Sequence, residues 1–122
     1  MLSVCYAGKF FDWFDCNEEK TFERCKDNNG KIYEGYFLGV CKKGRHLGLG
    51  EKMVQCAIDY ARNQDCSHCF CLTSGIYSQK IMKKKGLEVV VEKNYEDFKD
   101  KHGNVLIKNE THKTGQVNVL KL

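Results

Sequence analysis

The sequence lacks proline and has no long apolar run, and it shows no internal repeat or low-complexity stretch. Because no segment has the composition of a linker, we expect one domain over residues 1–122. The opening MLSVCYAGKFFDWFD has no basic segment, and it reaches Asp12 before an apolar run becomes long enough for a signal peptide or a membrane span. We therefore expect a cytoplasmic protein with no membrane partner.

The charge of the chain is only mildly one-sided. Charged residues make up 30% of the sequence, with a formal net charge of +4, and apolar residues make up 42%. That apolar content is sufficient for one modest core. The basic excess suits an anionic small molecule as well as nucleic acid, so the charge does not decide between them.

Eight cysteines are present, but they lie in periodic segments without an export signal. We interpret them as reduced thiols that pack as small apolar residues. The alternative is a zinc site in CSHCFC, residues 66–71, where Cys66 and Cys69 have zinc-knuckle spacing. A second ligand pair is missing, so we expect no metal. A zinc-dependent nucleic-acid module would use this segment and the lysines 83–85, but no aromatic residues alternate with those lysines, so we expect no nucleic-acid partner.

Apolar spacing predicts alternating helices and strands. Helical pieces are expected over residues 10–25, 48–63 and 74–86, and strands over 31–40, 68–74, 87–95, 104–109 and 115–122. We expect the last two strands to be adjacent and antiparallel. Ser74 is a candidate cap for the third helical piece, and Gly86 is expected to end it.

A glycine-rich turn, KKGRHLGLG, separates the strand that ends at Val40 from the helix that begins near Gly48. Such a turn presents unpaired backbone N–H groups and the positive end of the helix dipole to one point, which suits phosphate. The glycines let a pyrophosphate approach the backbone, and Lys42, Lys43 and Arg45 add positive charge. A plain strand-to-helix connection with solvated lysines is an equal alternative. The turn matches neither the P-loop nor the Rossmann fingerprint.

The spacing Arg45-x-x-Gly48-x-Gly50 resembles the R/Q-x-x-G-x-G/A acetyl-CoA signature of the GNAT acetyltransferase superfamily. The segment TSGIYSQKIMKKKGLEVVVEKNYEDF is similar to a second signature, that of insect-type arylalkylamine (dopamine) N-acetyltransferases. GNVLIKN and THKTGQVNVLKL resemble the closing strands of that branch, including a histidine at His112. The resemblance covers residues 19–122.

The resemblance implies an α/β fold with a mixed, splayed sheet flanked by helices, and acetyl-CoA in the cleft between residues 31–40 and 69–73. Pantetheine would pair with the backbone of Leu38 and Val40, and Tyr77 and Ser78 would stand beside the thioester. The pyrophosphate would contact amides of Arg45, His46, Leu47, Gly48, Leu49 and Gly50.

The implied reaction is acetyl transfer to a primary amine, an arylalkylamine such as dopamine, tryptamine or serotonin. Ser74 and Ser78 match the functional serine pair of the insect branch, and helix capping together with a surface hydroxyl is their alternative reading. Glu34 matches the general base of the histone-acetylating branch, and a solvated strand residue is its alternative. Polyamine acceptors remain open.

The chain departs from the branch at its N-terminal side, where the family's first strands and helices and its acidic catalytic residue would be absent. We therefore expect an N-terminally truncated domain, monomeric or weakly dimeric through an exposed sheet edge. A shortened, non-catalytic acetyl-CoA-binding or interaction protein is the alternative function.

Overall fold

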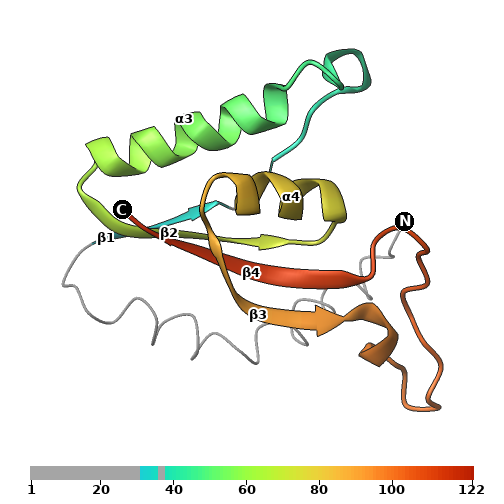
Figure 1. Ribbon diagram of the computed structural model, residues 1–122. Coiled ribbons are helices and arrows are strands. Elements are labelled where there is room, and N and C mark those ends of the chain that lie inside the picture. The colour runs from blue at the N-terminus through green and yellow to red at the C-terminus, as the bar shows by residue number, and fades with distance from the viewer. Residues whose placement is uncertain (1–30, 36–37) are drawn as a thin grey trace.

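The computed structural model describes residues 31–35 and 38–122. Four strands, Lys31–Gly35 (β1), Cys66–Thr73 (β2), Glu88–Asn94 (β3) and Thr114–Lys121 (β4), form one sheet. Two helices, Leu49–Asn63 (α3) and Ile76–Lys84 (α4), lie on one side of it (Figure 1). The helical pieces expected within residues 10–25 lie outside the described residues.

The strand order is β1-β2-β4-β3. The pair β1–β2 is parallel, whereas β4 is antiparallel to both of its neighbours. The mixed sheet flanked by helices confirms the expected fold class. Both helices begin toward the carboxyl ends of β1 and β2 and run back along the sheet (Figure 1), the arrangement in which α/β proteins bind ligands at those strand ends.

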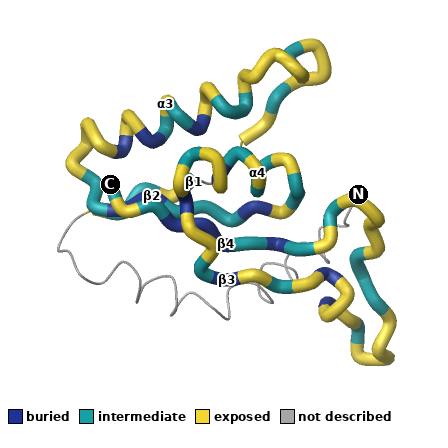
Figure 2. Tube along the Cα trace, in the orientation of Figure 1, coloured by how far each residue is buried: buried dark blue, intermediate teal, exposed yellow. Residues whose placement is uncertain are grey.

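Two apolar clusters sit on opposite faces of the sheet. On the helical face, Val54 and Ile58 of α3 and Met82 of α4 pack with Cys69 of β2. On the other face, Val91, Val117 and Val119 pack with Tyr95 and Phe98, which follow β3. Cys69 and Cys71 contribute to the first cluster and Phe70 and Leu72 to the second, so the expected alternation along β2 is confirmed. Figure 2 shows the buried positions concentrated along the central strands and the inner side of α3.

The structure corrects three local predictions. The strand expected over 31–40 ends at Gly35, and residues 38–40 have no regular structure. Residues 104–109 form no strand. Only a single bridge joins Val105 to Lys99, and β4 pairs with β2 and β3 instead. The apolar side chains of Leu106 and Ile107, within the β3–β4 connection, pack against the apolar cluster that includes Tyr95 and Phe98, which explains the misleading pattern.

The third correction concerns Ser74, which does not cap α4. The cap position is Gly75, which has no side chain to accept a hydrogen bond. The helix ends as expected, with Lys83 and Lys84 in its last turn and Gly86 just beyond it. Neither described helix has the length and apolar character that crossing a bilayer requires.

Candidate functional site

The parallel strands β1 and β2 lead toward the place where the site was expected. Their described pairing runs from Lys31 opposite Cys66 to Gly35 opposite Cys71. Residues 36–37 lie outside the described residues, and Leu38 to Val40, which follow them, pair with no described strand. The carboxyl ends of β1 and β2 are thus connected to the glycine turn through a segment without regular structure at residues 38–40.

The glycine turn has an unusual backbone path. His46 (φ 64°) and Gly48 (φ 71°) are both left-handed, and Gly48 is the cap residue of α3. This conformation costs little at glycine. The first helical hydrogen bond runs from the N–H of Lys52 to the carbonyl of Gly48 at 3.1 Å. The N–H groups of Leu49, Gly50 and Glu51 thus precede the helical ladder, and no described residue accepts a hydrogen bond from them.

Positive charge surrounds this turn. Lys42, Lys43 and Arg45 are exposed, and none of them is paired with an acidic side chain in the described part of the chain. Glu51 is the acidic residue in the first turn of α3, and it contacts Lys84 at 3.0 Å and Lys85 at 3.3 Å. Hydrogen bonds from Lys84 and Lys85 lower the pKa of Glu51. The positive charges of Lys84 and Lys85 thus offset the negative charge of Glu51, which would otherwise repel an anion at the start of α3.

The start of α3 also packs closely on its surroundings. A Cβ added at Gly50 would lie 3.4 Å from Cδ1 of Ile81 and 3.9 Å from Cγ2 of Val40. The glycine turn, residues 38–40 and α4 are therefore neighbours, as a ligand that spans them would require.

The predicted catalytic residues occupy different surroundings. Ser74 is exposed at the end of β2, and its carbonyl accepts a hydrogen bond from the hydroxyl of Tyr95. Ser78 lies in the first turn of α4 and donates to the carbonyl of Gly75 at 3.3 Å. Glu34 is exposed on β1, opposite Phe70. Tyr77 also lies in the first turn of α4, and it is 67% exposed.

The start of α4 is contacted by residues that the sequence did not single out as site residues. His112 accepts a hydrogen bond at Nδ1 from the N–H of Ile76, 3.0 Å away. Gln79 donates from Nε2 to the carbonyl of Thr114 at 2.7 Å. Tyr95 is buried, and this burial raises the pKa of its hydroxyl to about 12, so the group remains a donor. These contacts join segments distant in sequence, and no local pattern predicts them.

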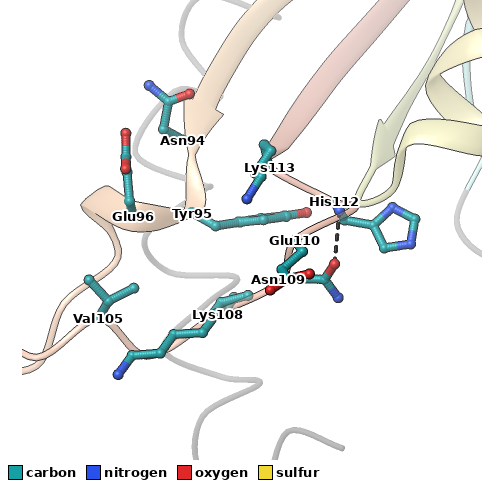
Figure 3. A pocket seen from close by; sticks show the side chains of 10 residues that line it. Asn94, Tyr95, Glu96, Val105, Lys108, Asn109, Glu110, His112 and Lys113 are labelled. Carbon is teal, nitrogen blue, oxygen red and sulfur yellow. Dashed lines mark hydrogen bonds between the residues drawn. The ribbon is translucent and has the colours of Figure 1, made fainter.

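A groove of about 610 Å³ is lined in part by Tyr95 and His112 (Figure 3). It is lined by Asn94, Tyr95, Glu96, Val105, Ile107, Lys108, Asn109, Glu110, His112 and Lys113. Its two glutamates and two lysines balance in formal charge. The zinc alternative gains no support, because no three His, Cys, Asp or Glu side chains converge as metal ligands within 31–35 and 38–122.

No protein-family profile and no curated protein sequence matches the chain. Solved structures do. A mosquito arylalkylamine N-acetyltransferase like 5b superposes with TM-score 0.79 at 17% identity, covering 100% of this chain and 58% of that one. Arylalkylamine N-acetyltransferase 2 from Aedes aegypti gives TM-score 0.70 at 22% identity, covering 74% and 42%.

A third likeness is to a GNAT family acetyltransferase from Elizabethkingia anophelis with acetyl-CoA bound. It has TM-score 0.59 at 18% identity, covering 77% of this chain and 63% of that one. This chain thus spans less than two thirds of each of these structures. The strand order and these superpositions show that the chain has the fold of the GNAT acetyltransferases.

Proposed function

We propose that the chain is an N-acetyltransferase that uses acetyl-CoA to acetylate a primary amine, with an arylalkylamine such as dopamine, tryptamine or serotonin as the acceptor. The observation that carries the proposal is the basic glycine turn, where the N–H groups of Leu49, Gly50 and Glu51 have no hydrogen-bond acceptor among the described residues. The fold neighbours named above support it, since one holds acetyl-CoA and two are arylalkylamine N-acetyltransferases.

In this proposal the cofactor follows the path from the glycine turn to α4. The amides from His46 to Gly50 hold the pyrophosphate, with Lys42 and Lys43 nearby, because helix N-termini and basic side chains both favour phosphate. The amide of Arg45, which was expected to take part, donates to the carbonyl of Lys42 at 3.4 Å instead. The backbone of Leu38 and Val40 pairs with pantetheine. The thioester then lies by Tyr77 and Ser78, where α4 begins.

The chemistry asks the protein mainly for positioning and proton transfer. The lone pair of the neutral amine attacks the thioester carbonyl carbon, the carbon–sulfur bond breaks, the nitrogen loses a proton and the thiolate gains one. We assign Ser78 the role of donor to the thiolate. Its hydroxyl now bonds to the carbonyl of Gly75 at 3.3 Å, a long contact that rotation about χ1 can exchange. Glu34 is the candidate for accepting the amine proton, directly or through water, and Ser74 is a candidate relay that gives up its own hydroxyl proton as it takes one. Solvent water returns a proton to Ser78 after it has protonated the thiolate.

A second candidate function is acetyl-CoA binding without turnover. The observation that favours it is that the described hydrogen bond of the Ser78 hydroxyl, to the carbonyl of Gly75, is a local one within the first turn of α4. The two candidates share the glycine turn and differ only in whether the amine is acetylated.

Calorimetric titration with acetyl-CoA tests the shared part, with desulfo-CoA and inorganic phosphate as controls. We expect micromolar binding of acetyl-CoA and of desulfo-CoA, because the sulfur takes little part in affinity, and much weaker binding of phosphate. Mass-spectrometric detection of acetylated tryptamine, dopamine or a polyamine then separates enzyme from binder. Absence of acetyl-CoA binding by a chain with native circular dichroism would refute both candidates, and binding without product would leave the second.

A further inference from the structure

Helix α3 has apolar residues on two sides, and the sheet covers only one of them. Val54 and Ile58 belong to the apolar cluster on the helical face of the sheet. A second apolar set lies about 150° around the helix from these two residues, as 3.6 residues per turn require. This set, the outer stripe, is exposed and consists of Leu49, Met53, Cys56 and Tyr60. The described part of the chain thus leaves this second face largely open to solvent.

The outer stripe has the spacing of a coiled-coil interface. Its members follow one another at steps of four, three and four residues, which are the a and d positions of a heptad. Single exposed apolar residues are ordinary on a soluble protein. Here they form a continuous row about 16 Å long. Met53 is 44% exposed and Tyr60 is 56% exposed, so the row has substantial apolar surface for a second helix to cover.

The residues on both sides of the outer stripe suit contact with a second helix. On one side lie Gly50 and Ala57, which are small and let another helix approach closely. On the other side lie Lys52 and Asp59, one heptad apart and both exposed. Lys52 has no ion pair among the described residues. Asp59 uses only Oδ1 for its described contacts within α3, so Oδ2 and Lys52 are both available to a second chain.

Tyr60, at the end of the outer stripe, is already held by a neighbour. Its ring meets the ring of Tyr33 edge-on, with centroids 6.0 Å apart and planes at 66°. Tyrosine and methionine are enriched in protein interfaces. A ring that is held before association loses less side-chain entropy when a partner covers it.

We propose that α3 packs antiparallel against α3 of a second copy of this chain through the outer stripe. In that register Met53 lies opposite Cys56 of the second copy, and Leu49 lies opposite Tyr60. Two-fold symmetry makes each contact occur twice.

Charge selects the antiparallel direction. In an antiparallel pair, Lys52 of each copy lies beside Asp59 of the other, which gives two opposite-charge contacts. In a parallel pair, Lys52 would lie beside Ala57 and gain no charged partner. The surface is therefore complementary to itself in one orientation. It differs from the sheet edge through which sequence predicted a weak dimer.

The expected dimer is weak. One pair of 15-residue helices falls at the low end of specific interfaces, below about 1,200 Å² of buried surface, so we expect a dissociation constant on the order of 0.1 mM. Sedimentation equilibrium of the wild type between about 10 μM and 1 mM covers this range. A reductant prevents a disulfide at Cys56 from imitating the dimer, and acetyl-CoA is left out. The result therefore does not depend on the proposed acetyl transfer, and neither proposal fails with the other.

Charge reversal tests the register. K52D makes both flanking charges acidic and D59K makes both basic, so each variant alone should weaken dimerisation at least about tenfold. An equimolar mixture of K52D and D59K should dimerise as the wild type does, because the acidic side of one variant meets the basic side of the other. The double variant K52D/D59K should also recover the dimer.

Two further sets of variants complete the test. K101D and D97K make the same changes of net charge at exposed positions in the β3–β4 connection, and they should dimerise as the wild type does. M53E should abolish the dimer and keep the circular dichroism spectrum of the wild type, since Met53 is exposed in the single chain. A wild type that stays monomeric at 1 mM, a dimer that M53E leaves intact, or a mixture of K52D and D59K that stays monomeric would each overturn the proposal.

Discussion

The hydroxyl of Tyr95 donates a hydrogen bond to the carbonyl of Ser74, 21 positions earlier in the chain, and so joins the end of β3 to the end of β2. Tyr95 is 5% exposed and Ser74 is exposed. One side chain thus belongs to the apolar core and to the edge of the proposed active site at once.

Replacing Tyr95 by phenylalanine isolates that hydrogen bond from the packing of the ring. We expect Y95F to lower the free energy of unfolding by about 1 kcal/mol, because water can take over the exposed carbonyl. Urea unfolding followed by circular dichroism measures this. A loss above about 3 kcal/mol would mean that the hydroxyl supports more than one carbonyl.

Thr73 and Asn118 form a buried polar pair between β2 and β4, with the Thr73 hydroxyl donating to Oδ1 of Asn118 at 2.7 Å. They are 2% and 1% exposed. We expect T73V and N118L each to destabilise the protein by roughly 1–3 kcal/mol. T73V leaves the buried Oδ1 of Asn118 without its donor, and N118L leaves the Thr73 hydroxyl with only its longer contact, 3.4 Å, to the carbonyl of Gln116. The double variant should lose less than the sum of the two, by at least about 1 kcal/mol. Strict additivity in urea unfolding would argue against the hydrogen bond.

The phosphate role of the glycine turn can be tested with a charge-only comparison at Gly48. Asparagine and aspartate have similar shapes, and both tolerate the left-handed backbone of this position better than other side chains do. We expect G48D to weaken acetyl-CoA binding at least about tenfold more than G48N, since only aspartate brings a negative charge to the pyrophosphate.

The same pair of substitutions at Gly103, whose φ is 82°, controls for backbone strain away from the turn. There, asparagine and aspartate should give equal affinities in calorimetric titration. Equal affinities for G48N and G48D would count against phosphate at the turn.

The serine pair is tested by S74A, S78A and the double variant. We expect S78A to lower kcat by about 10²-fold, the size of effect of a lost proton donor, with little change in the Kd for acetyl-CoA. S74A should have the smaller effect, because the described contact of Ser74 uses its backbone carbonyl. Normal turnover in the double variant would return both serines to structural roles.

Cysteine reactivity checks the burial pattern of β2. The pKa of Cys71 is raised to about 12, mainly by burial of the thiol and to a smaller extent by the nearby Cys69. At pH 8 only about one Cys71 thiol in ten thousand is then a reactive thiolate. Peptide mapping after brief iodoacetamide treatment should find label on the exposed Cys41 and Cys56 and none on Cys71 until denaturant is added. Labelling of Cys71 at the rate of Cys56 would show that β2 opens readily.

The elements that sequence predicted correctly are those whose own periodicity is strong. The apolar spacing of Val54, Ile58 and Ala61 repeats at helical intervals, and all three are buried in α3. In residues 104–109 the apolar side chains pack against the core from a loop, and none of the four described strands pairs with this segment. A pattern that tertiary packing creates resembles one that a strand creates.

The same distinction between local patterns and distant contacts applies to the candidate site. The glycine turn and the helix after it are adjacent in sequence, so their chemistry can be predicted from Arg45 to Gly50 alone. The support of α4 by Tyr95 and His112 cannot, because contacts that span 21 and 36 positions depend on the order of strands in the sheet. Sequence predicted the serines, whereas the structure shows what holds them.

The placement of β4 between β2 and β3 affects how the domain is made. On the ribosome, β2 and β3 are synthesised well before β4, residues 114–121. In the finished sheet β2 and β3 do not pair with each other, because β4 lies between them. The edges of β2 and β3 that pair with β4 therefore stay without that partner until β4 emerges from the exit tunnel. Pairings this distant in sequence form slowly. A chaperone that shields strand edges should raise the yield of native protein most when it is present during synthesis of this stretch.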